Sequence, residues 1–317
     1  MSKEHPIISM TGSAGAGTST LRRVLEKLFY RKHINVTYVM GDSFRRHDFE
    51  TWDQVFHEYQ KKGIDISHFG PEANEFDKIE SLFREYGKSG TGKIRQYLKN
   101  EELAKKYDLP QGKFSDYSEI PSESEVLFYD GFHGGLVTDK WSRRELSDSH
   151  NPEVIKIRED FDNVEHQDID VAQHVDLLVG VVPSMNLEWI QKIQRDISAT
   201  GIGSEAVSEA ILRRMPDYIN YIIPQFSVSD INFQRVPLVD TSNPFDARNI
   251  PTLDESMMVA RFRQPEKHDF RYLLSKIDGS FMSRPNTLVI PGSEFEYAIM
   301  AIFEPILDEM FEEKEES

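Results

Sequence analysis

The stretch GSAGAGTST, residues 12–20, constrains the fold of this chain more than any other part of the sequence. Gly12 and Gly17 have the spacing of the phosphate-binding pattern G-x-x-x-x-G-K-[ST], and Ser19 takes the position of the magnesium ligand. Thr18 replaces the lysine of that pattern. Because the lysine is missing, the loop alone does not distinguish a phosphate-binding loop from a flexible Gly/Ser turn. The segments on either side of it must be considered.

The segments on either side of this loop favour phosphate binding. The apolar run PIISMT, residues 6–11, predicts a buried strand, and residues 18–32 repeat apolar side chains at the period of an amphipathic helix. A loop between a strand and a helix N-terminus offers unpaired backbone N–H groups and the positive end of the helix dipole to an anion. We expect phosphate groups to contact the whole loop: Gly12, Ser13, Ala14, Gly15, Ala16, Gly17, Thr18, Ser19 and Thr20.

Strands and helices alternate along the chain. Strand-like runs lie at 34–40, 124–131, 175–182, 231–240, 256–263 and 286–292. Helical patterns lie at 18–32, 72–86, 186–198, 204–215 and 293–311. This alternation predicts an α/β fold with a mostly parallel central sheet flanked by helices. We expect a single domain, residues 1–317, with a polar insertion near 140–170 and an acidic C-terminal tail.

Charge and composition exclude several classes of protein. The formal net charge of −17 argues against nucleic acid or an anionic membrane as the main partner. The chain has no cysteine, which excludes a disulfide framework and a thiolate metal site. No apolar run approaches the ~20 residues of a membrane span, and the N-terminal residues predict a strand and a loop, not a signal peptide. We expect a cytoplasmic protein that acts on a small molecule.

Phosphoryl transfer requires a magnesium ligand, cations and a base for the acceptor hydroxyl. Asp42 follows a predicted strand and is a candidate base, although a helix N-cap explains it equally well. Asp130 ends another predicted strand and is a candidate magnesium ligand, or a turn residue before Gly131. Among ten histidines no pair has a convincing metal-ligand spacing, and only His133 follows a candidate active-site strand.

A predicted helix near the middle of the chain carries Lys192, Arg195 and Asp196 at i, i+3 and i+4, hence on one face. Such spacing is usually an exposed ion-pair face. If the helix closes over a nucleotide, Lys192 and Arg195 supply the cations that the loop lacks, as do Arg213 and Arg214. Asp196 is a second candidate for the base or a magnesium contact.

Long stretches of the chain resemble the bacterial (class I) phosphoribulokinases and their homologues. They include GDSF (41–44), SHFGPEANEF (67–76), LFYDGFHGG (127–135), HVDLLVGVVPSMNLEWIQKIQRD (174–196) and DYINYIIPQFSVSDINFQRVPLVDTSNPF (217–245). The resemblance covers almost the whole chain apart from roughly 140–170. The family also carries threonine in place of the loop lysine, so Thr18 is a family trait.

The resemblance implies a phosphate-loop kinase fold with a mixed, mostly parallel central sheet. It implies that ATP and D-ribulose 5-phosphate, with Mg²⁺, give D-ribulose 1,5-bisphosphate and ADP, a step of carbohydrate metabolism in the Calvin cycle. It also implies residue roles: Asp42 as the catalytic base; Lys192, Arg195 and Asp196 in catalysis or binding; Arg214 in ATP binding; and Asp130 at an acidic position that is usually Glu.

The resemblance further implies an assembly and its regulation. Bacterial members are typically octamers that respond to NADH and AMP. We therefore expect a homo-oligomer, with NADH as a possible activator and AMP as a possible inhibitor. Arg31, Arg261 and Arg284 match positions tied to that regulation.

The acceptor side departs from the family pattern at several positions. Arg45 replaces the usual His, and Thr200 replaces an Arg. Phe49 and Asp53 align with an Arg and a Lys that contact the sugar phosphate in the family. Lys99 and Asn100 occupy positions where a His is common. Each lost charge-assisted contact removes ~1.5–3 kcal/mol. Two alternatives therefore stay open: a kinase for another small acceptor, such as a different sugar phosphate or uridine, and a nucleotide-sensing homologue with little activity.

Overall fold

The structure is a computed structural model that describes residues 4–12, 18–138, 169–182, 184–200, 204–245 and 250–315. The side chains of residues 195–200, 204–205 and 312–315 are not among those described. Most of the predicted polar insertion near 140–170, and the last residues of the acidic tail, therefore lie outside the described residues.

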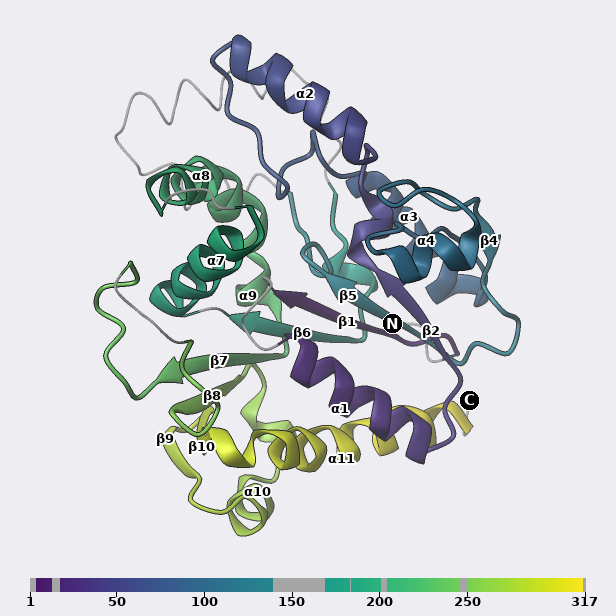
Figure 1. Cartoon of the computed structure of the whole chain (residues 1–317). Coiled ribbons are helices and arrows are strands. Elements are labelled where there is room, and N and C mark those ends of the chain that lie inside the picture. The colour runs from purple at the N-terminus through teal and green to yellow at the C-terminus, as the bar shows by residue number, and fades with distance from the viewer. Residues whose placement is uncertain are drawn as a thin grey trace.

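A sheet of eight strands crosses the molecule in the order β2-β5-β1-β6-β7-β8-β10-β9 (Figure 1). The parallel strands are β1 (Ile7–Gly12), β2 (Val36–Met40), β5 (Val126–Gly131), β6 (Leu177–Val182) and β7 (Ile231–Pro237). Three antiparallel pairings add β8 (Ser256–Phe262), β10 (Thr287–Pro291) and β9 (Phe281–Arg284). A separate ribbon pairs β3 (Lys93–Ile94) with β4 (Ser118–Glu119). The prediction of a mixed, mostly parallel sheet is confirmed.

Helices lie on both faces of this sheet, whereas α2 (Phe49–Lys61) projects away from it (Figure 1). The other α-helices of the described residues are α1 (Thr18–Arg31), α3 (Phe76–Ser89), α4 (Glu101–Tyr107), α7 (Met185–Thr200), α8 (Ser204–Asp217), α9 (Gln225–Val228), α10 (Phe270–Lys276) and α11 (Phe295–Glu315). α1 and α11 lie side by side on one face. No helix among the described residues is long and apolar enough to cross a membrane.

Alternating side chains of the central strands build two separate cores. Ile8 and Phe128 join the core under α1 and α11, whereas Ile7 and Leu127 join the core under α3. Successive residues of a strand point to opposite faces, so a strand buried on both faces is a continuous apolar run. Each fully buried side chain contributes about 1.5–3 kcal/mol. These cores fix the strand ends that carry the site.

Every strand-like run of the sequence coincides with an observed strand, although the observed strands are shorter by one to three residues at an end. The structure also has elements outside the predicted strands and helices, chiefly α2, α4, α10 and β9. α2 has no buried residue, although its apolar side chains Phe49, Trp52, Phe56 and Tyr59 recur at helical spacing. Its start is signalled only by Asp48, whose side chain accepts a hydrogen bond from the Thr51 backbone N–H at 2.9 Å.

Candidate active site

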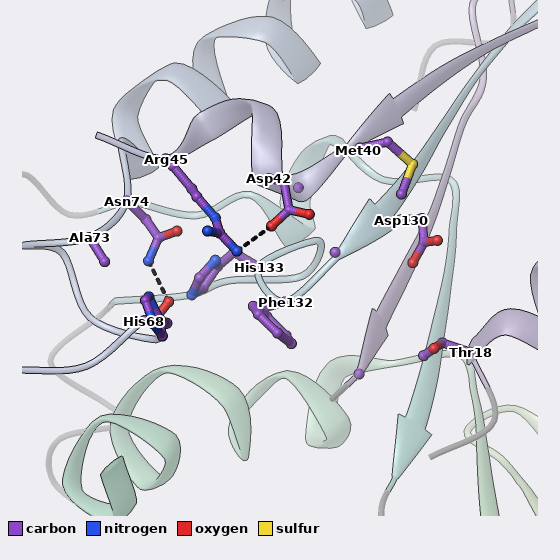
Figure 2. A pocket seen from close by; sticks show the side chains of 13 residues that line it. Thr18, Met40, Asp42, Arg45, His68, Ala73, Asn74, Asp130, Phe132 and His133 are labelled. Carbon is purple, nitrogen blue, oxygen red and sulfur yellow. Dashed lines mark hydrogen bonds and ion pairs between the residues drawn. The ribbon is translucent and has the colours of Figure 1, made fainter. Parts of the chain in front are cut away.

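A pocket of about 140 Å³ opens at the carboxyl ends of β1, β2 and β5 (Figure 2). Its lining comes from these strand ends, the start of α1 and two loops: Gly12, Thr18, Met40, Gly41, Asp42, Arg45, His68, Ala73, Asn74, Asp130, Gly131, Phe132 and His133. Ligands of open α/β sheets bind at this edge, because loops after neighbouring parallel strands meet there. The pocket brings together Gly12, Thr18, Asp42 and Asp130 from the sequence prediction.

Two glycines let the ends of β2 and β5 touch. A Cβ added to Gly41 would lie 2.8 Å from the Gly131 Cα, and one added to Gly131 would lie 2.7 Å from the Gly41 Cα. Neither position has room for a side chain. The close approach places Asp42, next to Gly41, and Asp130, next to Gly131, around one pocket.

Asp42 lies in the short 3-10 helix η1 (Gly41–Phe44), directly after β2. Its Oδ1 accepts from Nη2 of Arg45 at 2.7 Å, the dashed contact in Figure 2. The Arg45 guanidinium also lies over the Tyr97 ring, with Cζ 4.7 Å from the ring centroid. The candidate base is therefore paired with a cation that lines the same pocket.

Arg95 holds the backbone of the segment that carries Asp42. Its Nε donates to the carbonyl of Ser43 at 3.0 Å, and its Nη2 donates to the carbonyl of Arg45 at 2.8 Å. The same Nη2 lies 3.0 Å from a carboxylate oxygen of Glu75. The Arg95 side chain is 14% exposed, so water competes little for these contacts.

Asp130 is the buried carboxylate of the pocket. Burial raises its pKa, while Arg22, whose Nη1 lies 3.5 Å from Oδ2, and Lys99 oppose that rise. The charge of Asp42 raises the pKa further. Arg22 comes from α1 and also donates to the sulfur of Met40 at 3.4 Å, so one cation links the first helix to the ends of β2 and β5.

Two histidines line the pocket, and both are neutral. Burial lowers the pKa of His68 to about 3, and the charges of Arg45, Arg214 and Lys192 lower it further. Burial lowers the pKa of His133 to about 4, and its Nε2 is hydrogen-bonded to the carbonyl of Phe69 at 2.9 Å. His133, singled out from the sequence, is therefore a core residue that positions a loop, not an acid or a base.

Lys192 and Arg214 face a smaller hollow of about 40 Å³ between α7 and α8. Its other lining residues are mostly apolar: Phe69, Met185, Glu188, Trp189, Ile211, Met215 and Tyr218. Both cations also act on His68, which lines the main pocket. The predicted cations therefore lie next to the site. Arg195 and Asp196 belong to α7, but their side chains lie outside those described.

The residues present fit a magnesium nucleotide. A Cβ on Gly12 would lie 2.6 Å from the Val181 carbonyl oxygen, so the loop can begin there only with glycine. Ser19 is exposed in the first turn of α1, and with Asp130 it offers the oxygen ligands that Mg²⁺ prefers. The described part of the chain has no cluster of three acidic or histidine side chains that could hold a metal ion. Loop residues 13–17 (Ser13, Ala14, Gly15, Ala16 and Gly17) lie outside the described residues.

The three arginines that the family resemblance relates to regulation do not line this pocket. Arg31 ends α1, and its Nη2 lies 3.6 Å from a carboxylate oxygen of Glu304 on α11. Arg261 and Arg284 lie on different strands, and both pair in register with Thr287 of β10. Arg261 and Arg284 therefore lie on the two strands that flank Thr287.

Sequence reasoning missed the residues that hold the site together, chiefly Arg22, Tyr97, His68, Asn74 and Arg95. Asn74, for example, donates to the carbonyls of His68 and Gly70 at 2.8 and 2.9 Å and fixes the loop beside Arg45. Arg95 instead reaches carbonyls 52 and 50 residues away, so no local pattern marks its contacts.

Known proteins are similar to this chain over nearly its whole length. A family model described as the Phosphoribulokinase / Uridine kinase family matches residues 7–150 and 161–242. The phosphoribulokinase of Rhizobium meliloti (strain 1021) is 46% identical over 314 residues, which cover 99% of each chain. The plasmid phosphoribulokinase of Cupriavidus necator is 46% identical over 315 residues, which cover 99% of this chain and 98% of that relative.

A solved structure agrees with these sequence matches. The structure of phosphoribulokinase from Rhodobacter spheroides matches with a TM-score of 0.83 and 41% sequence identity, covering 99% of this chain and 100% of that chain. Fold, pocket position and sequence therefore point to one family. This chain belongs to the Phosphoribulokinase / Uridine kinase family.

Proposed function

We propose that this protein is a phosphoribulokinase, which transfers the terminal phosphoryl group of ATP to a hydroxyl of D-ribulose 5-phosphate and releases D-ribulose 1,5-bisphosphate and ADP. One observation carries the proposal: Asp42 and Asp130 line a single pocket beside the start of the phosphate loop. The near full-length similarity to phosphoribulokinases supports the same reaction.

We infer the following roles for the residues of the pocket. Asp42 accepts the proton of the attacking hydroxyl, because it is the carboxylate at the open end of β2. Ser19 and Asp130 hold Mg²⁺, which bridges phosphate oxygens and neutralises their charge. Lys192 and Arg214 stabilise the transferring phosphoryl group in place of the absent loop lysine. Arg195 and Asp196 are proposed to complete this set.

The acceptor-side departures still allow a phosphorylated sugar. Phe49 is 67% exposed, and neither Phe49 nor Asp53 is among the residues that line the pocket. Arg45 does line it, and the charge of Lys99 acts on Asp130 within it. Two cations therefore remain beside the place where the acceptor must approach Asp42, which supports an anionic acceptor over uridine.

Further properties follow from the family and stay proposals. We propose that the chain works as one kinase domain, because a single sheet takes strands from residue 7 to residue 291. We also propose a cytoplasmic homo-oligomer, an octamer as in the family, that NADH activates and AMP inhibits. The absence of cysteine and the use of ATP support the location.

An ADP-release assay with magnesium-ATP tests the proposed reaction. The panel contains ribulose 5-phosphate, other pentose and hexose phosphates and uridine, each with and without NADH. We expect turnover of roughly 1–10³ s⁻¹ on ribulose 5-phosphate. Turnover only on another acceptor would replace the substrate, and ATP binding without turnover would favour a nucleotide-sensing protein. Asp42→Asn serves as the blank for contaminating kinases.

A further inference from the structure

We propose that Arg45 stays paired with the base Asp42 until an anionic group of the acceptor binds the Arg45 guanidinium in place of Asp42. The inference rests on the proposed function, because it assumes that Asp42 is the base. It adds a specificity-determining role for Arg45: the acceptor's phosphate is required for catalysis as well as for binding. An acceptor without an anion leaves the base paired.

The ion pair itself is the first observation. Nη2 of Arg45 lies 2.7 Å from Oδ1 of Asp42, and both side chains line the pocket. Figure 2 shows the second carboxylate oxygen of Asp42 pointing away from Arg45. The guanidinium therefore occupies one oxygen of the carboxylate and fixes its orientation. While the pair persists, that oxygen is not available to the hydroxyl of an acceptor.

The surroundings of Arg45 let its side chain move while its backbone stays fixed. The two side chains of the pair are 32% and 29% exposed, which makes the pair weak and exchangeable. The flat Tyr97 ring, 4.7 Å from Cζ, supports the guanidinium without tying it to one acceptor. Arg95 meanwhile anchors the carbonyls of Ser43 and Arg45.

A phosphate group competes well for this guanidinium. It carries more charge than a carboxylate and offers three acceptor oxygens in the geometry that arginine binds with two parallel hydrogen bonds. His68, which faces Arg45, is neutral and cannot replace its charge. The exchange would leave Asp42 unpaired at the moment when the acceptor is seated.

The experiment separates the sugar from its anion. D-ribulose, which lacks the phosphate, is the acceptor. Phosphite dianion is added as a separate molecule in place of the missing phosphate group. In the unmodified protein we expect phosphite to raise the turnover number of D-ribulose roughly 10–100-fold, the range expected for one charge-assisted contact. In Arg45→Met we expect no activation by phosphite, and a loss of kcat/KM on ribulose 5-phosphate that is larger than the change on D-ribulose.

Two further variants make the test specific. Arg45→Lys keeps a cation and is expected to restore part of the phosphite activation. Lys113→Met removes an exposed cation that pairs with Asp48 and Glu50 outside the pocket, and phosphite activation should persist in it. Thermal unfolding of each variant shows that it is folded.

Three outcomes would overturn the proposal. In the first, phosphite does not activate the unmodified protein. In the second, phosphite activates Arg45→Met as much as it activates the unmodified protein. In the third, Arg45→Met loses turnover on D-ribulose and on ribulose 5-phosphate by the same factor. Failure of the proposed function gives a different result, since the unmodified protein would then be inactive on ribulose 5-phosphate. If the panel yields another phosphorylated acceptor, the same test applies to that acceptor and its dephosphorylated form.

Discussion

The nucleotide side and the acceptor side of the pocket are built in different ways. On the nucleotide side, one continuous stretch, β1, its loop and α1, carries Gly12, Thr18 and Ser19. On the acceptor side, the segment with Asp42 depends on Arg95, which lies 52 residues beyond the Ser43 carbonyl that it holds. Local sequence therefore specifies the first side, while tertiary packing specifies the second. Substitutions that disturb packing should affect acceptor use before they affect nucleotide binding.

The largest expected effect separates the two sides directly. Asp42→Asn removes the proposed base but keeps the size of the side chain, so we expect kcat to fall roughly 10²–10⁴-fold. The dissociation constant for magnesium-ATP should stay within a factor of about 3, because Asp42 belongs to the acceptor side. Steady-state kinetics and calorimetric ATP titration provide both values. Full activity in this variant would remove Asp42 as the base.

Asp217 links the two sides of the pocket, and its ionisation should make the stability of the protein depend on pH. It ends α8, which carries Arg214, and its Oδ2 accepts from the Ser67 hydroxyl at 2.7 Å. Burial raises the pKa of Asp217 to about 7, and the charges of Glu72 and Asp65 add to that rise. Since the unfolded pKa is about 3.9, the protonated form stabilises the fold fully below about pH 4, and this stabilisation is lost as pH rises to about 7.

The Asp217→Asn variant should abolish this pH dependence. The free energy of unfolding should change between pH 4.5 and 8 by about 3 kcal/mol less than in the unmodified protein. Urea denaturation at several pH values measures the difference, and Asp278→Asn, at an exposed carboxylate that does not act on Asp217, is the matched control. Identical pH profiles for the unmodified and Asp217→Asn proteins would show that Asp217 does not titrate in this window.

Arg95→Met tests whether packing specifies the acceptor side. The variant loses hydrogen bonds to two carbonyls and the ion pair with Glu75, whose side chain is 12% exposed. We expect the free energy of unfolding to fall by about 3 kcal/mol. KM for the acceptor should rise while KM for ATP changes little. Lys113→Met, which breaks exposed ion pairs, should cost only about 0–1 kcal/mol. An equal rise in both KM values would mean that the two sides are not independent.

Much of the fold was predictable because its strands are continuous apolar runs. Residues 126–129 are buried, and the sequence shows them as the apolar run VLFY. α2 was not predicted, although Phe49, Trp52, Phe56 and Tyr59 recur in it at helical spacing and none of its residues is buried in the structure. The switch to antiparallel pairing at β8 depends on contacts between strands that no single run contains.

The candidate site was predictable where it coincides with strand ends. Asp42 and Asp130 follow strands, and parallel strands bring their carboxyl ends to one edge. The supporting contacts of Arg22 and Arg95 could not be predicted from local sequence, because Arg22 reaches Met40, 18 residues away, and Asp130 on another strand, and Arg95 reaches a carbonyl 52 residues away. His133 shows the converse, since its position after a strand suggested chemistry whereas its burial makes it part of the core.

The smallest expected effect concerns how far the acceptor-binding region extends beyond Arg45. The resemblance led us to expect Phe49 at the position of a phosphate-contacting arginine, yet Phe49 is 67% exposed and does not line the pocket. Phe49→Arg should therefore change KM for ribulose 5-phosphate by less than about 3-fold, since an exposed charge at a distance is screened by salt. The comparison is made at 0.15 M salt, with Phe49→Gln as the uncharged control. A tenfold fall in KM for Phe49→Arg alone would mean that the acceptor's phosphate reaches α2, and the acceptor side would then extend beyond Arg45.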